Sequence, residues 1–195
     1  KVAAIRKAIG PGRRLLVDGN GAYTLAQALM LWERIRGFDI YHYEEPCPYT
    51  DVEAYRALAR AVPVPINVGE QDWNLHVFRD FIAGGACGVA AADLTKCGGY
   101  AQARRVAALC RAHDIVYSPH NTSRGIGMAA HLQLIASCPE CAHFHEFSIE
   151  KGGGSERFLA KPFAPVDGRL GVPCGPGLGV ELDTDRIQGE LQRVE

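Results

Sequence analysis

Short apolar runs alternate along the chain with longer segments in which apolar residues recur every three or four positions. In TLAQALMLWERIRG, the apolar positions on one helix face are Leu25, Ala28, Leu29, Trp32 and Ile35. This spacing predicts an amphipathic helix. The short runs are rich in β-branched residues and show little polar alternation, which is typical of parallel strands covered on both faces.

The same two patterns predict further helices over 1–10, 52–61, 75–85, 100–114 and 125–137. The expected strands cover 13–20, 40–46, 66–70, 87–96, 115–121 and 142–147. Thr24 is placed to cap the helix after it, and Gly37 to end that helix. Because strands and helices follow each other in turn, we expect a parallel sheet joined by right-handed crossovers.

The alternation stops after Phe147, and the composition changes to one rich in Gly and Pro. We therefore expect a partial (β/α) barrel domain over 1–150 and a C-terminal loop and hairpin segment over 151–195. KGGGSERF is predicted to be a loop, and Asp167-Gly168 is a typical hairpin turn.

Composition narrows the class of protein. The chain has 195 residues, 47% of them hydrophobic, which is enough for a substantial core. With 21 basic and 22 acidic residues it lacks the positive charge of a nucleic-acid binder. No apolar run approaches the roughly 18 residues of a membrane helix, and no signal peptide opens the chain. Seven cysteines without a disulfide-like framework favour reduced thiols, so we expect a cytoplasmic protein with no membrane partner.

Each of the six predicted strands ends in a residue able to do chemistry. They are Asp18, Glu44, Glu70, Asp93, His120 and Glu146, at intervals of 26, 26, 23, 27 and 26 residues. One unit of a (β/α)8 barrel takes roughly 30 residues, and barrel active sites lie at the carboxyl ends of the strands. The recurrence therefore predicts one site at the mouth of a barrel.

The first three of these residues are carboxylates on consecutive strands. Asp18, Glu44 and Glu70 would repel one another at close range unless a cation neutralised them. An all-oxygen donor set suits Mg²⁺. Glu45 would face the other way and support Glu44, although a solvated strand end would also explain this acidic pair.

The remaining residues suit proton transfer. Asp93 can orient His120, giving a dyad able to take or give a proton near neutral pH. Glu146 can hydrogen-bond a substrate oxygen and donate to it if burial raises its pKa. A divalent ion beside a base suggests removal of the proton α to a carboxylate, because the ion stabilises the resulting charge. The expected partner is a small-molecule carboxylate.

Six short motifs, taken together and in this order, resemble the enolase superfamily and specifically its mandelate racemase subgroup. They are VDGN at 17–20, YEEP at 43–46, VGE at 68–70, DLTKCGG at 93–99, SPHN at 118–121 and HFHE at 143–146. The resemblance runs from about residue 1 to residue 183. It implies an enolase-like C-terminal barrel domain that binds Mg²⁺ through Asp18, Glu44 and Glu70.

The resemblance also implies the catalytic dyad of Asp93 and His120, and a Glu146 that hydrogen-bonds the substrate carboxylate or its enediolate. Asn20 is similar to an asparagine that accompanies the first ligand. Lys96 matches a lysine in the family's motif at barrel strand six, DLTKCGG in this chain. It is expected to contact the residues of the site and not the metal or the substrate directly. Asn121 could contact the substrate or begin the next helix, and both alternatives remain open here.

Members of this family carry an N-terminal capping domain and two barrel strands before the first ligand, and neither precedes Asp18. We therefore expect about six of eight βα units, strands three to eight, in a fragment or in a chain completed by a partner. The family often forms symmetric assemblies, so a homo-oligomer is expected.

The leading functional reading is Mg²⁺-dependent dehydration of a sugar acid to a 2-keto-3-deoxy acid. The alternatives are a racemase or epimerase of a 2-hydroxy acid and a non-catalytic barrel fragment. The muconate-cycloisomerase branch carries a lysine where Asp93 stands, which disfavours that branch and its dipeptide-epimerase relatives.

A second candidate metal site is the cluster of Cys138, Cys141, His143 and His145. These residue types are zinc ligands, but structural zinc sites usually place more residues between the cysteine pair and the histidine pair. The spacing therefore argues against zinc.

Overall fold

A computed structural model describes residues 1–141, 143–149 and 154–192. Its sheet is parallel, and its strands lie in chain order. They are β1 (Leu15–Asp18), β2 (Ile40–Glu44), β3 (Ile66–Val68), β4 (Val89–Ala90) and β5 (Val116–Tyr117). The helices are α1 (Val2–Ile9), α2 (Leu25–Ile35), α3 (Val52–Ala61), α4 (Leu75–Ile82), α5 (Tyr100–Ala112), α6 (Ile126–Ser137) and α7 (Thr184–Leu191).

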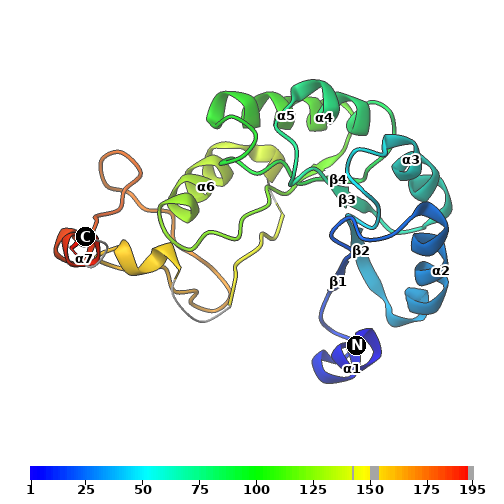
Figure 1. The fold of residues 1–195 in the computed structure, drawn as a ribbon, viewed down its shortest axis with the longest axis horizontal. Coiled ribbons are helices and arrows are strands. Elements are labelled where there is room, and N and C mark those ends of the chain that lie inside the picture. The colour runs from blue at the N-terminus through cyan, green and yellow to red at the C-terminus, as the bar shows by residue number, and fades with distance from the viewer. Residues whose placement is uncertain (142, 150–153, 193–195) are drawn as a thin grey trace.

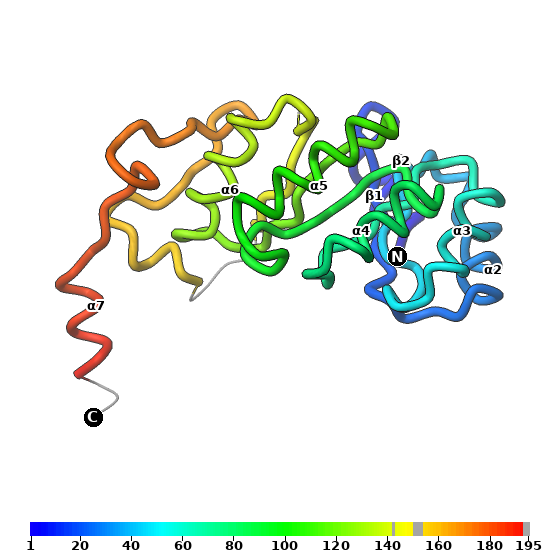
Figure 2. The backbone as a smooth tube through the Cα atoms, turned by 90° about the horizontal axis from the view of Figure 1, so that it is seen from above, coloured from blue at the N-terminus to red at the C-terminus, as the bar shows by residue number. Residues whose placement is uncertain are grey.

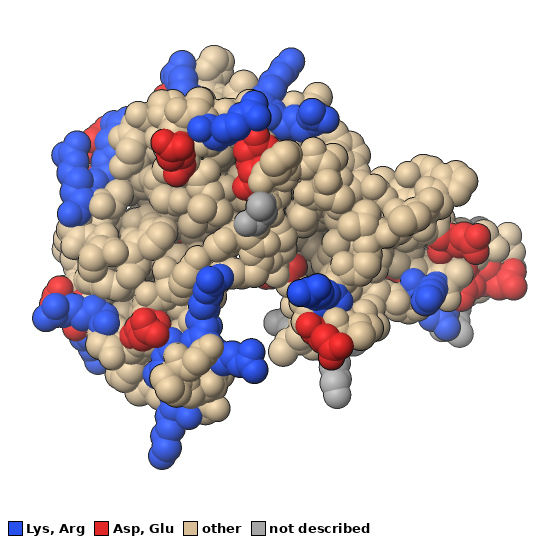
Figure 3. Space-filling view, turned by 180° about the vertical axis from the view of Figure 1, so that it is seen from behind, with Lys and Arg blue, Asp and Glu red and all other residues tan. Residues whose placement is uncertain are grey.

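The strands and helices form an open arc in which α2, α3, α4 and α5 lie on the outer side of the sheet (Figure 1). Each strand pairs in parallel with its neighbour in the chain, so β1 and β5 are the two edges of the described sheet. A space-filling view from behind shows the notch left between the α1 end and the C-terminal segment (Figure 3). The α/β architecture of an incomplete barrel is therefore confirmed.

The core fills the space between the sheet and the outer helices. Tyr43, Tyr55, Phe81 and other large side chains are fully buried there. The Tyr55 and Phe81 rings meet edge to face, with centroids 5.3 Å apart. Because strand side chains alternate between faces, burying Tyr43 against the helices turns Glu44 to the inner side of the arc.

The helices begin and end close to the predicted positions, with one error. A capping box opens α2: the Thr24 side chain accepts from the Gln27 N–H, and the Gln27 side chain accepts from the Thr24 N–H. The prediction that Gly37 ends this helix is wrong. The helix ends at Ile35, a 3₁₀ turn covers Arg36–Phe38, and the left-handed residue is Asp39, with φ of 51°. A short acidic side chain tolerates that conformation.

The predicted sixth strand is also wrong for the described residues 143–147, and Ala142 lies outside the described residues. This segment forms no strand-to-strand hydrogen bonds among the described residues. A turn and side-chain contacts hold it in place. The His143 N–H donates to the Cys141 carbonyl at 2.7 Å. The Phe144 carbonyl accepts from the Ser118 hydroxyl at 3.4 Å, and the Phe144 ring packs on Tyr41.

The C-terminal segment continues from a 3₁₀ turn at Ser155–Phe158 to α7, which lies at the end of the molecule far from β1 and β2 (Figure 2). The predicted turn at Asp167-Gly168 is confirmed: both have positive φ, 50° and 73°, and Val166 pairs with Arg169 across it. Residues 151–153 of the predicted glycine loop lie outside the described residues. None of the described helices is long and apolar enough to cross a membrane.

Candidate active site

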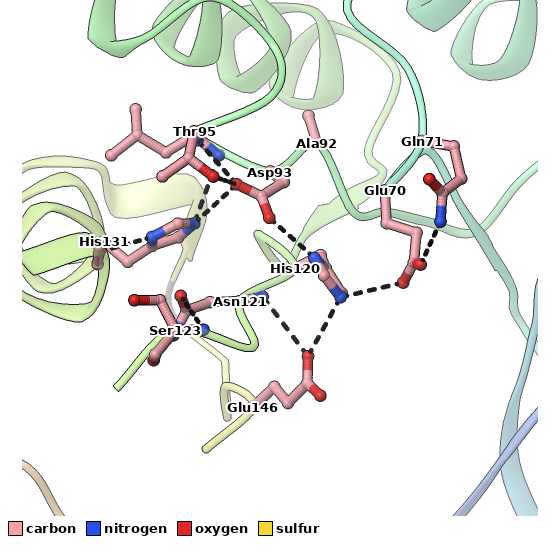
Figure 4. A network of polar contacts seen from close by, with 12 residues as sticks. Glu70, Gln71, Ala92, Asp93, Thr95, His120, Asn121, Ser123, His131 and Glu146 are labelled. Carbon is pink, nitrogen blue, oxygen red and sulfur yellow. Dashed lines mark hydrogen bonds and ion pairs between the residues drawn. The ribbon is translucent and has the colours of Figure 1, made fainter. Parts of the chain in front are cut away.

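A polar cavity of about 290 Å³ lies at the carboxyl ends of the strands. Five of the six strand-end residues line it: Asp18, Glu44, Glu70, His120 and Glu146. Asn20, Lys96 and Thr122 complete the lining. The sixth residue, Asp93, lies directly behind His120 (Figure 4). The structure thus brings together residues that are up to 128 positions apart in the sequence.

The parallel sheet explains this convergence. Asp18 and Glu44 are the last residues of β1 and β2 and are direct partners across the two strands. Glu70 follows β3 after one glycine. Because the strands run in one direction, their last residues reach the same rim of the arc.

Each of the three carboxylates accepts a hydrogen bond from a nearby amide. Asp18 Oδ1 accepts from the Asn20 N–H at 2.8 Å. Glu44 Oε1 accepts from Asn67 Nδ2 at 2.8 Å, and Glu70 Oε1 accepts from Gln71 Nε2 at 2.7 Å.

The charges of Glu44 and Glu70 also affect the pKa of Asp18. Burial raises the pKa of Asp18 above its ordinary value, and the negative charges of Glu44 and Glu70 raise it further against the Asn20 hydrogen bond. This mutual repulsion is what a cation would relieve.

The donor chemistry fits a hard divalent cation, because three carboxylates from adjacent strand ends line one cavity. As the side chains stand, no three His, Cys, Asp or Glu residues in the described parts of the chain are close enough to hold one ion. Glu70 Oε2 instead lies 3.2 Å from His120 Nε2.

The histidine and aspartate form the predicted pair. His120 Nδ1 lies 2.9 Å from Asp93 Oδ2 (Figure 4). The other oxygen of Asp93 accepts from the Thr95 N–H and from the Thr95 hydroxyl, both at 2.7 Å. Burial alone would raise the pKa of Asp93, but the hydrogen bonds from His120 and Thr95 outweigh it and hold that pKa below its usual value. An ionised Asp93 keeps a proton on His120 Nδ1 and turns Nε2 to the cavity.

The second nitrogen of His120 lies among acids. It is 3.2 Å from Glu70 Oε2 and 3.9 Å from Glu146 Oε2. Burial and the nearby Lys96 lower the pKa of His120, with burial the largest effect, but the Asp93 hydrogen bond and the charges of Glu70 and Glu146 outweigh them. The pKa is therefore raised, and His120 can carry a proton on the side that faces the cavity.

Glu146 lines the same cavity, with Oε2 3.9 Å from His120 Nε2. Burial raises the pKa of Glu146, and its Oε2 accepts from the Asn121 backbone N–H at 3.4 Å. A glutamate with a raised pKa is suited to donating a hydrogen bond to a substrate oxygen.

Besides Asp93, two predicted site residues, Glu45 and Asn121, do not line this cavity. Glu45 is buried on the other side of its strand, where it accepts from the Gly69 N–H at 3.3 Å, and burial raises its pKa to about 7. The Asn121 side chain bonds to the backbone of Ser123 in both directions, at 3.0 and 3.1 Å. This geometry favours the alternative in which Asn121 shapes the chain before α6.

Three of the four side chains weighed as zinc ligands, those of Cys138, His143 and His145, contact other protein groups. Cys138 Sγ donates to Glu140 Oε2 at 3.1 Å, and His145 Nε2 lies 2.8 Å from the Cys141 carbonyl. His143 stacks on Tyr41 with ring centroids 5.9 Å apart. These contacts use the side chains in packing and in the turn after α6.

Sequence reasoning missed two residues that contact the site. Asn67 is the cross-strand partner of Glu44, and an amide inside the apolar strand INV was a usable signal. His131 lies on α6 with Nε2 3.5 Å from Asp93 Oδ1. Its position in the apolar helix MAAHLQLIA gave only a weak signal, because a buried histidine is often structural.

Comparison with known proteins identifies the family. The model of the enolase C-terminal domain-like family matches residues 1–186, and the chain belongs to this family. D-galactarolactone cycloisomerase of Agrobacterium fabrum is 32% identical over 193 residues, which cover 95% of this chain and 51% of that protein. N-succinylamino acid racemase of Amycolatopsis is 36% identical, covering 92% of this chain and 48% of the relative. D-xylonate dehydratase of Haloferax volcanii is 26% identical, covering 100% and 47%.

Solved structures agree with the fold. The 3,6-anhydro-D-galactonate cycloisomerase from Zobellia galactanivorans superposes with a TM-score of 0.89 at 30% identity, covering 96% of this chain and 53% of that one. A racemase from Streptomyces coelicolor, solved with bound magnesium, superposes with a TM-score of 0.84 at 26% identity, covering 96% and 49%. The chain therefore spans about half the length of the relatives it matches.

Proposed function

We propose that the protein containing this chain is a Mg²⁺-dependent enzyme that removes the proton α to a carboxylate. Among the reactions of this class, we propose dehydration of a sugar acid to a 2-keto-3-deoxy acid. The observation that carries the proposal is the cavity itself. Three strand-end carboxylates line it together with His120, whose other nitrogen is bonded to Asp93. Relatives named as dehydratases, cycloisomerases and racemases support this class of chemistry.

In the proposed site, Asp18, Glu44 and Glu70 would hold Mg²⁺, and the ion would supply positive charge that stabilises the enediolate. His120 is the proton carrier at the cavity wall, and Asp93 fixes its orientation. Glu146 would hydrogen-bond the substrate carboxylate, and Lys96 adds positive charge at the same cavity.

The dehydration balances without any further reactant. A base takes the α-proton, and the electron pair of the broken C–H bond moves into the carboxylate. The pair then forms a carbon–carbon double bond as the β-hydroxyl accepts a proton and leaves as water. The resulting enol tautomerises to the 2-keto acid. His120 can serve as the base or as the acid that protonates the departing hydroxyl, because its Nε2 faces the cavity.

Cycloisomerisation shares the first of these steps, and it enters the proposal because a relative with that name matches nearly the whole chain. In that reaction the group that leaves the β-carbon, or adds to it, is a ring oxygen instead of water. The racemase or epimerase alternative is supported by the relatives named as racemases. It needs a second base on the other face of the substrate.

The test is a proton NMR screen of the native-length protein in D₂O with Mg²⁺ and a panel of sugar acids, their lactones and 2-hydroxy acids. Loss of a sugar acid with a new deuterated methylene establishes dehydration. Ring opening or closure with deuterium incorporation establishes cycloisomerisation, and α-proton exchange without loss of substrate establishes racemisation.

Magnesium binding is measured alongside by calorimetry. The triple variant Asp18→Asn, Glu44→Gln, Glu70→Gln is the control, and we expect it to lose the binding. A folded native-length protein that binds no Mg²⁺ and exchanges no α-proton would overturn the proposal.

A further inference from the structure

A second histidine, His131, lies next to Asp93 of the dyad. The proposed mechanism does not use it. His131 lies on α6 and is 1% exposed, while Asp93 and Leu94 are 3% and 4% exposed. Figure 4 shows the His131 ring beside Asp93, on the side away from His120. Three buried polar groups surround this ring, and their chemistry determines which of its nitrogens carries a proton.

The His131 Nδ1 atom lies 2.8 Å from the Gly127 carbonyl oxygen. A carbonyl can only accept, so Nδ1 carries the proton of this hydrogen bond. The other nitrogen, Nε2, lies 3.3 Å from the Leu94 backbone nitrogen, which can only donate. The Leu94 N–H therefore donates to a bare Nε2, and His131 is neutral.

The remaining neighbour of Nε2 is Asp93 Oδ1 at 3.5 Å. A bare nitrogen gives this carboxylate no proton, and Oδ1 is already bonded to the N–H and hydroxyl of Thr95. The link from His131 to the dyad therefore runs through the backbone of residue 94, and not through a third proton-transfer step.

We infer that His131 is a positioning residue for the dyad: by accepting from the Leu94 N–H, it fixes the turn at residues 93–95 so that Asp93 Oδ2 stays aimed at His120 Nδ1. This inference rests on the proposed function for its kinetic consequence only. The hydrogen-bond geometry can be tested without any substrate.

The physical reason is that Leu94 N–H is buried and needs an acceptor. Without one, the turn would shift until the N–H finds another partner, and the Asp93 carboxylate would move with it. Displacements of about 1 Å at a catalytic group can cost roughly 10²-fold in rate.

Two variants separate positioning from packing. His131→Phe keeps a ring of similar size and removes the acceptor. His131→Gln restores an acceptor, because its amide oxygen can bond the Leu94 N–H. The matched control is Gln133→Leu, two positions along α6, whose amide bonds the Pro173 carbonyl at 2.7 Å and not the dyad.

The first readout is histidine-ring ¹⁵N NMR of the native protein and these variants. We expect a neutral His131 protonated on Nδ1, and a low-field Nδ1 proton for His120 that broadens or shifts in His131→Phe. That signal should return in His131→Gln and stay unchanged in Gln133→Leu. The second readout is kinetic: His131→Phe should lower kcat about 10- to 100-fold with little change in KM, with recovery in His131→Gln.

Protonation of His131 on Nε2, or an unchanged His120 signal in folded His131→Phe, would overturn the inference. If His131→Phe does not fold, the protonation state in the unmodified protein and the signal of His131→Gln still decide it. Failure of the proposed function would appear differently. The unmodified protein would then convert none of the substrates, while the histidine-ring NMR spectra would still show the expected pattern.

Discussion

At the scale of single residues, the site depends on how acids are partnered. Asp93 is bonded on both oxygens and its pKa is lowered, whereas Glu146 is about half exposed, accepts from the Asn121 backbone N–H, and has its pKa raised by partial desolvation. Environments that move the pKa values of acids apart create distinct roles for them. Asp93 is therefore suited to orient a histidine, and Glu146 is suited to donate a hydrogen bond.

Replacing Asp93 should uncouple the histidine from its support. In Asp93→Asn the amide can present its NH₂ to His120 Nδ1, which would move the ring proton to Nε2 and block the nitrogen that faces the cavity. We expect α-proton exchange to fall about 10²- to 10⁴-fold, the range typical of general acid–base catalysis. Deuterium incorporation followed by NMR measures it. Asp80→Asn, an exposed residue paired with Arg79, is the control and should retain full exchange.

Glu45 allows a prediction about pH and stability. Its pKa rises from 4.5 to about 7, chiefly because it is 2% exposed. A raised pKa means that the folded protein binds the proton more tightly than the unfolded chain does. The stabilisation is thus complete below pH 4.5 and is lost as the pH rises toward 7.

Glu45→Gln keeps an acceptor for the Gly69 N–H and removes the titration. The unfolding free energy of the unmodified protein should therefore fall, relative to that of Glu45→Gln, by up to about 3 kcal/mol between pH 4.5 and 7. Urea denaturation in EDTA across this range measures the difference. Parallel pH profiles for the two proteins would show that Glu45 does not titrate in this range.

At the scale of elements, the sequence predicted most of what the backbone alone determines. Hydrophobic period placed α2 and α3, Thr24 marked the start of α2, and the strand spacing correctly placed Asp18, Glu44 and Glu70 on one rim. The error at 142–147 arose because alternating residues predict a strand without showing that a neighbouring strand pairs with it. His131 was missed because its role depends on α6 lying against the turn at residues 93–95, which no local pattern reveals.

The cap of α2 is the clearest element-scale test. Thr24 Oγ1 accepts from the Gln27 N–H at 3.3 Å, and Gln27 Oε1 accepts from the Thr24 N–H at 3.0 Å. Thr24→Ala removes the first bond and should lower the unfolding free energy by about 1 kcal/mol. Chemical denaturation measures it, with the exposed Thr50→Ala as a matched control that should change little. Equal losses in both variants would mean that the box adds no stability of its own.

At the scale of the whole molecule, the site residues come together although the described sheet that carries them does not close into a barrel. The described strands bring Asp18, Glu44, Glu70 and His120 to one cavity, yet the sheet they form has two edges. The site residues converge because neighbouring strands pair, which needs only part of a barrel wall. Closing the wall requires partners for β1 and β5, and these edges carry unpaired backbone groups that readily pair with another chain.

This difference makes a prediction about association of the 195-residue chain. Leu16 is 37% exposed on the edge strand β1, so the chain should self-associate as its concentration rises. Leu16→Lys puts a charge at this edge, a substitution that opposes strand pairing, and should shift the population toward monomer. Met30→Lys is the control, because Met30 is 68% exposed but lies on α2 and not on a strand. Sedimentation velocity over a concentration series measures all three proteins. Equal association of the unmodified chain and Leu16→Lys, or a loss of association in Met30→Lys alone, would place the contact away from β1.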